Sequence, residues 1–298
     1  MLKKIARWIL VLLGICALAV VGLALWVQPV PDHPFFDTRN VQVIAHRGGH
    51  GLWPGNTLYA FKHAVEMGVD VLEMDLRSTR DSVLIIFHDD TVDHTTDGTG
   101  PVGSFTLAEL KGLDAGYHWT PDKGGTYPYR GQGIRVPTLA EVFAALPDVR
   151  MNIEMKETDP NLVDAFCRTI REYGKTHQIL ATSFKAKTLR QFRRQCPEVA
   201  TSTGFTEGLA FYILSRLYLG AAYPPPAQAV QIPERFGALH VAIPQFIRAA
   251  HAHNMHVHIW TVNKPADMQR LLALGVNGII TAYPDRLLKV LGRPAGLQ

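Results

Sequence analysis

Beyond Pro31 the chain alternates short apolar runs with longer helical patterns, and no other feature constrains its fold as strongly. The runs are rich in β-branched residues, which is typical of buried strands. Repeated strand and helix units predict an α/β fold with a parallel sheet, and enough repeats close the sheet into a TIM-type (β/α)8 barrel. The expected strands are 41–45, 70–76, 83–88, 149–155, 178–183, 199–203, 228–232, 256–261 and 277–281. The expected helices lie near 57–67, 138–145, 160–174, 185–195, 207–222, 243–253, 264–274 and 284–291.

Nine candidate strands are one too many for a barrel of eight, and the spacing of 70–76 and 83–88 resolves the surplus. Only about six residues separate these two runs, whereas a parallel crossover needs roughly a dozen or more. We therefore expect an extra antiparallel hairpin strand outside the barrel count. If its turn has two residues, paired positions sum to 161, which places His88 opposite Glu73 and on the same face as Asp75.

The N-terminal run from Trp8 to Val30 contains no charged residue. A run of this length spans a bilayer core of about 30 Å. Basic residues precede it and acidic residues follow it, so the positive-inside bias leaves the N-terminus cytoplasmic. We therefore expect a cytoplasmic tip and single transmembrane helix over 1–30, a linker over 31–40, and an exported barrel domain over 41–298, on the periplasmic or extracytoplasmic side. A cleaved signal peptide is the alternative, because small residues within the run resemble a cleavage site.

Composition favours one large globular domain that acts on a small molecule. The chain has 298 residues, of which 47% are hydrophobic, enough to bury a substantial core. Its formal net charge is +4, and three basic residues lie in the first seven positions, which leaves about +1 for the rest and makes nucleic acid a poor partner. Of three cysteines, Cys16 lies in the apolar run, so at most Cys167 and Cys196 could pair. We expect these thiols to be unpaired core fillers, because a large core does not need a disulfide.

Four short segments end the expected strands with residues suited to phosphate or metal chemistry. They are Ala45-His46-Arg47-Gly48, Glu73-Met74-Asp75, Phe87-His88-Asp89 and Glu154-Met155-Lys156. Functional groups of a parallel barrel lie at the carboxyl ends of its strands, so we expect the four segments to meet. Glu73, Asp75 and Glu154 would supply three hard oxygen ligands for one divalent cation, Ca²⁺ or Mg²⁺. Each acid alone could be an ordinary surface residue. Strand alternation, however, places Glu73 and Asp75 on one strand face and Glu154 on the face opposite its apolar neighbours, which favours a shared site for the trio.

From about residue 43 to 288 the chain resembles the glycerophosphodiester phosphodiesterase family. Six blocks carry the resemblance in order: HRGGHGLWPGNT, EMDLRSTRDSVLIIFHDDTVDHTTDGTG, VPTLAEV, NIEMK, HIWTVN and GVNGIITAYPD. The resemblance implies a TIM-type barrel, a divalent cation, and hydrolysis of glycerophosphodiesters to glycerol 3-phosphate and an alcohol. Gly55 replaces an acid of the family pattern, and Ala282 stands where the family often has Asp. We expect both departures to affect substrate preference more than reaction class.

The resemblance also implies roles for single residues. His46 and His88 resemble the family's acid and base pair, and an imidazole with a pKa near about 6.5 can take and give a proton. Arg47 and Lys156 would bind the phosphate, the first as a planar fork and the second as a point charge. Trp260 would lie by the site and pack on the glycerol. A solvated loop end remains the alternative for Lys156, and core packing for Trp260.

Two further segments bear on the substrate. Residues 92–136 resemble the family's insertion that caps the barrel mouth, and we assign them to headgroup selection, with simple surface decoration as the alternative. Helix 207–222 is apolar enough to touch a bilayer surface, although ordinary barrel packing explains it as well. The competing functions are lysophospholipase D-type hydrolysis of lysophospholipids at the membrane surface and, from another class, a non-catalytic phosphodiester-binding module.

Overall fold

The computed structural model describes residues 26–36 and 40–296, together with isolated positions before residue 26. Most of the expected transmembrane segment and part of the expected linker lie outside the described residues. Within the described part of the chain, no helix has the length and apolar character needed to cross a membrane.

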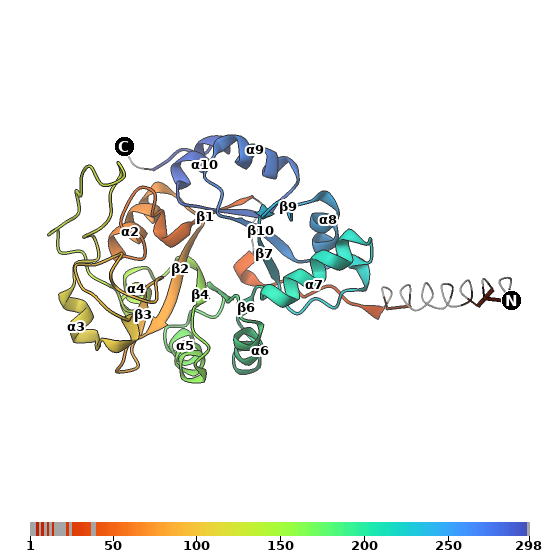
Figure 1. Ribbon diagram of the computed structural model, residues 1–298, viewed down its shortest axis with the longest axis horizontal. Coiled ribbons are helices and arrows are strands. Elements are labelled where there is room, and N and C mark those ends of the chain that lie inside the picture. Colours follow the sequence, from red (N-terminus) through yellow and green to blue (C-terminus); the bar gives the residue numbers. More distant parts are fainter. Residues whose placement is uncertain are drawn as a thin grey trace.

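Eight strands of the described chain form a nearly closed barrel, in the order β6, β5, β4, β2, β1, β11, β10 and β7 (Figure 1). Their bounds are Gln42–Ala45 (β1), Val71–Ser78 (β2), Arg150–Met155 (β4), Ile179–Thr182 (β5), Ala200–Thr201 (β6), Ala229–Pro233 (β7), His256–Trp260 (β10) and Gly278–Thr281 (β11). Neighbours on this path are parallel, and a bridge from Ser202 to Ala229 joins its two ends. The TIM-type architecture predicted from the sequence is confirmed. β6 is shorter than the expected strand 199–203.

Helices cover the outside of the barrel (Figure 1). They are Leu58–Met67 (α2), Leu139–Ala145 (α4), Pro160–Glu172 (α5), Ala186–Gln195 (α6), Phe205–Arg216 (α7), Pro244–Ala252 (α8), Pro265–Ala273 (α9) and Pro284–Val290 (α10). Thr57 caps α2 by accepting a hydrogen bond from the backbone of Ala60, and Thr138 forms a capping box at α4. α5, α8, α9 and α10 begin with proline, which suits a first turn because the missing N–H has no helical partner there.

The extra strand β3 (Leu84–Ile86) pairs antiparallel with the end of β2, as predicted, but the predicted register is wrong by one residue. Leu76 pairs with Ile86, so paired positions sum to 162 instead of 161. The turn holds three residues, because the backbone N–H of Thr79 donates to the carbonyl of Val83. Ser82, the last turn residue, has φ 62°. A tight turn followed by one left-handed residue is the usual form of a three-residue hairpin loop.

A cluster of apolar side chains packs inside the barrel. Phe35 and Phe36, which precede the first strand, pack into it. Their neighbours in this cluster are Ile44, Val71, Leu180, Ala200, Ala229 and Ile280. Every buried hydrophobic residue among those described lies at Phe35 or later in the chain. Residues 27–298 therefore contain the whole of the described core.

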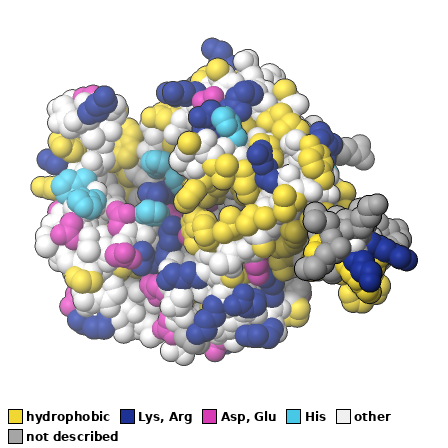
Figure 2. Space-filling view, turned by 45° about the vertical axis from the view of Figure 1, so that its right-hand side comes forward, with side chains coloured by type: hydrophobic (Ala, Val, Ile, Leu, Met, Phe, Trp, Pro, Cys, Tyr) yellow, Lys and Arg dark blue, Asp and Glu magenta, His cyan; other side chains and the backbone are white. Residues whose placement is uncertain are grey.

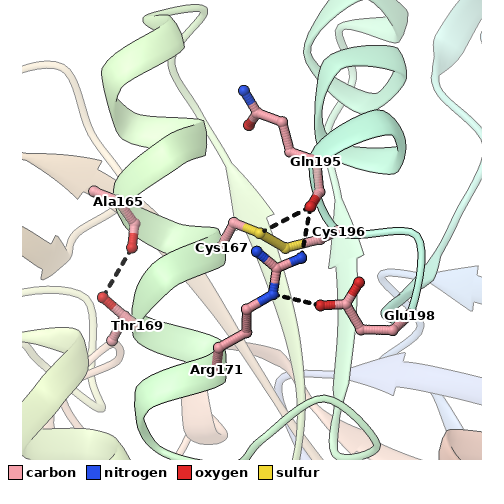
Figure 3. The surroundings of a disulfide bond; sticks show 7 residues. All are labelled: Ala165, Cys167, Thr169, Arg171, Gln195, Cys196 and Glu198. Carbon is pink, nitrogen blue, oxygen red and sulfur yellow. Dashed lines mark hydrogen bonds and ion pairs between the residues drawn. A yellow bond between two sulfur atoms is a disulfide. The ribbon is translucent and has the colours of Figure 1, made fainter.

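Cys167 of α5 and Cys196, which follows α6, form a disulfide, so the expectation of two unpaired thiols is wrong (Figure 3). α5 and α6 pack side by side and bring the two Cα atoms to 6.0 Å, within the usual span of about 4.4–6.8 Å. Arg171 joins the same elements, because its guanidinium donates to the carboxylate of Glu198 and to the carbonyl of Gln195 (Figure 3). This proximity depends on helix packing, which cysteine spacing alone does not reveal.

The insertion 92–136 lies to one side of the barrel, beside α2 and β3, and contains an unpredicted helix, α3 (Leu107–Gly112) (Figure 1). It has a small core of its own, which packs on Ile85 and Phe87 of the hairpin. Its buried members are Val92, Val102, Leu110, Ala115, Ile134 and Val136. A second unpredicted feature follows β7, where Arg235–Phe236 (β8) and Leu239–His240 (β9) form a short hairpin.

Candidate active site

A cavity of about 470 Å³ opens at the carboxyl ends of the barrel strands. All eight site residues predicted from the sequence line it: His46, Arg47, Glu73, Asp75, His88, Glu154, Lys156 and Trp260. The fold thus brings together segments that lie far apart in the chain, at the end of the barrel where parallel barrels carry their functional groups.

Three carboxylates lie together at the base of this cavity. β2 and β4 are adjacent, and their register pairs Asp75 with Glu154, while alternation puts Glu73 on the same strand face as Asp75. One oxygen from each acid lies within 4.8 Å of the others. Glu73 and Asp75 are only 6% and 1% exposed. Among the described residues, no other trio of histidine, cysteine or acidic side chains is as close.

The charges around the trio do not allow all three acids to ionise easily. Burial and the neighbouring charge of Asp75 raise the pKa of Glu73 well above its usual value. Burial also raises the pKa of Glu154, although Lys156 opposes this effect. Burial alone would raise the pKa of Asp75 too, but Lys156 and Arg47 hold it below its usual value. The trio is therefore short of positive charge, and a divalent cation would supply it.

Two basic side chains border the acids. The Lys156 Nζ lies 3.0 Å from Asp75 Oδ1 and donates to Glu154 Oε2 at 2.8 Å, so Lys156 is not a solvated loop end. The Arg47 Nε lies 3.4 Å from Asp75 Oδ2, and the Arg47 backbone N–H donates to Glu73 Oε2 at 2.8 Å. Arg47 has φ 51° in the tight turn η2 (His46–Gly48) directly after β1. This left-handed turn allows one residue to contact two of the acids.

Asn56 also belongs to the site, although the sequence did not single it out. Its Nδ2 donates to Asp75 Oδ2 at 2.8 Å, and its backbone N–H donates to the carbonyl of Arg47. Asn56 is buried and has φ 58°, a conformation that asparagine tolerates better than most residues. The available signal was its place in the block that also contains Arg47, immediately before the cap of α2.

Gly55 makes room for a histidine. A Cβ added at Gly55 would lie 2.7 Å from the Cβ of His50 and 3.1 Å from that of Arg47. Because Gly55 has no Cβ, His50 fits beside it, and its ring packs edge-on against His46 with 4.7 Å between ring centroids. Trp119 of the insertion donates its Nε1–H to the carbonyl of His50 at 2.8 Å. His50 therefore links the insertion to the site, a contact that the sequence did not predict.

His46 and His88 have different surroundings. The His46 Nε2 lies 3.8 Å from Glu73 Oε2, and burial, followed by the charges of His50 and Arg47, lowers the pKa of His46 to about 2. The His88 Nδ1 lies 2.6 Å from Asp89 Oδ1, which favours a proton on Nδ1 and leaves Nε2 for chemistry.

His88 reaches the cavity by a different route from the one predicted. It follows β3, so the hairpin register does not hold it opposite Glu73. Arg77 of β2 holds it instead, because its guanidinium donates twice to the His88 carbonyl, at 3.0 and 2.9 Å. Arg77 also pairs with Asp90 at 2.6 Å. The predicted place of His88 at the mouth is confirmed, although the predicted register was wrong.

One wall of the cavity is apolar. Trp260 ends β10 there, packs edge-on against Phe184 with 5.5 Å between centroids, and also contacts the apolar cluster inside the barrel. Trp260 thus combines the two roles expected for it, core packing and lining of the site. The other large apolar residues of this wall are Phe205, Leu209, Tyr212, Phe236, Leu239 and Val241.

The insertion lines a second, smaller cavity of about 290 Å³. This cavity shares Arg47 and His88 with the larger one, and its polar lining includes Asp89, His118 and Trp119. None of the residues lining the larger cavity comes from the insertion. The insertion therefore flanks the mouth instead of covering it.

Known proteins with similar sequences and structures point in one direction. The sequence profile of the Glycerophosphoryl diester phosphodiesterase family matches residues 46–286. A glycerophosphodiester phosphodiesterase of Caldanaerobacter subterraneus subsp. tengcongensis is 32% identical over 83% of this chain and 96% of that protein. A lysophospholipase D of Rattus norvegicus is 26% identical over 83% of this chain and 85% of that protein. The structure of an Oleispira antarctica phosphodiesterase in complex with the product sn-glycerol-3-phosphate is 26% identical, has a TM-score of 0.67, and covers 84% of this chain and 96% of that one.

Proposed function

The chain belongs to the glycerophosphoryl diester phosphodiesterase family, and we propose that it hydrolyses glycerophosphodiesters to glycerol 3-phosphate and an alcohol. The observation that carries this proposal is the meeting of three acids, two histidines and two basic side chains in one cavity at the mouth of the barrel. A binding module has no chemical need for this whole set.

Glu73, Asp75 and Glu154 would hold one divalent cation. Their buried oxygens lie close together and lack sufficient neighbouring positive charge, which suits Ca²⁺ or Mg²⁺. When bound, the cation supplies Lewis-acid stabilisation of charge on the phosphate. Arg47 and Lys156 border the acids and would bind the remaining phosphate oxygens.

The two histidines would move the protons. His46 is neutral at physiological pH, because burial lowers its pKa to about 2, and a neutral imidazole can accept the proton of the attacking hydroxyl or water. The Asp89 carboxylate would orient the His88 ring through Nδ1, and His88 would donate a proton from Nε2 to the leaving alkoxide. His50 packs on His46 and would keep its ring in place.

The two cavities suit the two arms of a phosphodiester, because they meet at Arg47 and His88. The glycerol would enter the larger cavity and pack on Trp260. The alcohol headgroup would enter the smaller one, where His118 and Trp119 of the insertion would select it. This division gives the insertion the role in headgroup selection that its place beside the mouth supports.

The apolar wall of the larger cavity favours a second candidate activity, lysophospholipase D-type hydrolysis. Glycerol phosphate has no apolar group that requires Phe184, Phe205 or Leu209, whereas the acyl chain of a lysophospholipid would pack against them. The similarity to a rat lysophospholipase D agrees with this possibility.

We infer that the barrel works outside the cytoplasm, attached by an N-terminal transmembrane helix within the uncharged run, which ends by Trp26 because residues 27–30 are not helical. The uncharged run with basic residues before it supports this topology. The disulfide between Cys167 and Cys196 supports it independently, because disulfides persist mainly in oxidising compartments.

Product analysis tests the two activities together. Residues 27–298 are incubated with glycerophosphocholine or lysophosphatidylcholine in the presence of Ca²⁺ or Mg²⁺, and the phosphorylated products are identified by mass spectrometry. Glycerol 3-phosphate from the first substrate is the expected result. Lysophosphatidic acid from the second would establish the second activity. If neither substrate gave a product, the chain would instead be a non-catalytic phosphodiester-binding module.

A further inference from the structure

Helix α7 exposes a continuous stripe of apolar side chains. Its buried side packs Phe211 against the barrel, as in an ordinary barrel helix. The α7 stripe is formed by Phe205 (50% exposed), Leu209 (44%), Ile213 (50%) and Leu217 (61%), the last at the helix end. These residues recur every four positions and so lie on one face. A barrel helix normally turns polar residues to the solvent, so this face lacks the usual pattern.

The stripe begins at the mouth of the larger cavity. Phe205 and Leu209 line this cavity while remaining half exposed. Phe236 and Leu239 of the β8–β9 hairpin do the same, and the rings of Phe205 and Phe236 lie 6.4 Å apart. Figure 2 shows hydrophobic side chains gathered on this side of the molecule around a hollow, with Lys and Arg side chains about them. The exposed apolar surface is thus continuous with the apolar wall of the cavity.

The other end of the stripe lies beside the point where the N-terminal segment joins the barrel. The backbone N–H of Val30 donates to the carbonyl of His253 at 3.0 Å. The His253 ring bonds in turn to the carbonyl of Gly220, just beyond α7. A chain of direct contacts therefore connects the end of the predicted anchor to the end of the stripe. A helix of this length is about 18 Å long at about 1.5 Å per residue, so the stripe spans the side of the barrel from anchor to mouth.

Charge on this side favours a lipid surface. Glu207 and Glu234 are the only acids in residues 201–266. Both are paired, Glu207 with Arg193 at 2.8 Å and Glu234 with Arg270 at 2.6 Å. The exposed cations of the same segment are Arg216, Arg235, Arg248 and Lys264. Asp32, an exposed acid near the anchor junction, accepts a hydrogen bond from Asn254. A surface with an apolar stripe, several cations and few acids resembles an interfacial membrane helix.

We propose that the α7 stripe and the β8–β9 hairpin dock on the lipid bilayer, so that the barrel lies on its side with the mouth of its larger cavity at the membrane surface. The bilayer fits better than a second copy of the chain, because a symmetric contact would bring the cations of both copies together. The docking proposal rests on the proposed function only for the N-terminal anchor, which orients the barrel. The docking itself needs no catalytic turnover.

Vesicle flotation tests this docking without the anchor. Residues 27–298 contain the whole described core and would be mixed with vesicles of phosphatidylcholine and phosphatidylglycerol. The test variant is Ile213→Gln with Leu217→Gln, because neither residue lines a cavity and glutamine preserves helix propensity. Tyr173→Gln is the control, since Tyr173 is an exposed aromatic residue beyond the end of α5, on another side of the barrel.

Wild-type protein and the control are expected to float with the vesicles, and the double variant to partition at least about tenfold less. All three should hydrolyse soluble glycerophosphocholine equally, which shows that the variants are folded. Floating wild-type protein that lacks this activity would refute the proposed function and leave the docking intact. Wild-type protein that stays in the aqueous fraction, or a double variant that floats as well as wild type, would overturn the docking. A concentration-dependent dimer that the double variant abolishes in lipid-free sedimentation would also overturn it, in favour of a second copy.

Discussion

At the scale of single residues, Asp75 is the point where the charges of the site meet. Lys156 contacts its Oδ1, while Arg47 and Asn56 contact its Oδ2. Asp75 is almost completely buried. These partners keep Asp75 ionised where burial alone would favour its protonated form. An ionised acid at the centre of the trio is what a cation site requires.

Asp75→Asn is expected to weaken Mg²⁺ and Ca²⁺ binding by at least about tenfold, because it removes the ionised ligand while preserving shape and the bond to Asn56. Isothermal titration of residues 27–298 with each cation measures the effect. Asp267→Asn, at an exposed acid on α9, is the control. Equal affinity of the Asp75 variant and wild type would mean that the cation binds elsewhere.

His88→Ala is expected to lower kcat by about 10²–10⁴, the usual contribution of a general acid or base. Cation affinity should remain nearly unchanged, because His88 faces Asp89 and is not one of the three clustered acids. Turnover and calorimetry on the same preparation check both values. A loss of cation affinity as steep as the loss of turnover would make His88 a ligand instead.

Gly55→Glu, which restores the acid of the family pattern, is expected to reduce turnover at least about tenfold in this chain. The new Cβ would clash with His50 and Arg47 and displace the phosphate-binding turn. Combining it with His50→Gly should restore part of the activity, because the closest contact of the new Cβ is with the Cβ of His50, which glycine lacks. Activity of the single variant equal to wild type would show that the turn adapts without cost.

At the scale of secondary structure, the disulfide joins α5 to the end of α6. Replacing both Cys167 and Cys196 by serine is expected to lower the free energy of unfolding by about 3–4 kcal/mol, the entropic value for a loop of this size. Their separation of 29 residues sets this loop. Urea unfolding of the oxidised wild type and the double variant measures the difference. Equal midpoints would mean that helix packing alone holds this region.

The order of strands and the convergence of the eight site residues could be predicted because strand periodicity and motif position are local signals. The hairpin register could not, because it depends on whether Ser82 takes a left-handed conformation, which adds one residue to the turn. His50 and Asn56 were missed because their roles come from contacts with Trp119 and Asp75 that only the folded chain creates. The disulfide was missed for the same reason.

At the scale of the whole molecule, the barrel interior holds two histidines in the neutral state. Burial and the neighbouring His256 lower the pKa of His258 to about 3, and burial and His251 lower that of His256 to about 4. Phe36 stacks on His256, and Gln231 bonds to His258. An unfolded chain binds protons at these positions below a pKa of about 6.5, whereas the folded chain does not.

Stability is therefore expected to be greatest above about pH 6.5 and to fall as pH decreases toward 4, by up to about 1.4 kcal/mol per pH unit for each histidine. Urea unfolding at a series of pH values measures this slope. His258→Gln should flatten it, because glutamine has no proton to gain. A slope that the variant leaves unchanged would assign the acid sensitivity to other groups.

Metal-dependent release of glycerol 3-phosphate tests the central claim most directly. Residues 27–298 would be stripped with a chelator and assayed with glycerophosphocholine before and after adding Mg²⁺ or Ca²⁺. We predict no release without the cation and full recovery with it, in wild type but not in Asp75→Asn. Equal release with and without chelator, or equal recovery in the variant, would contradict a hydrolase that works through a cation held by Glu73, Asp75 and Glu154.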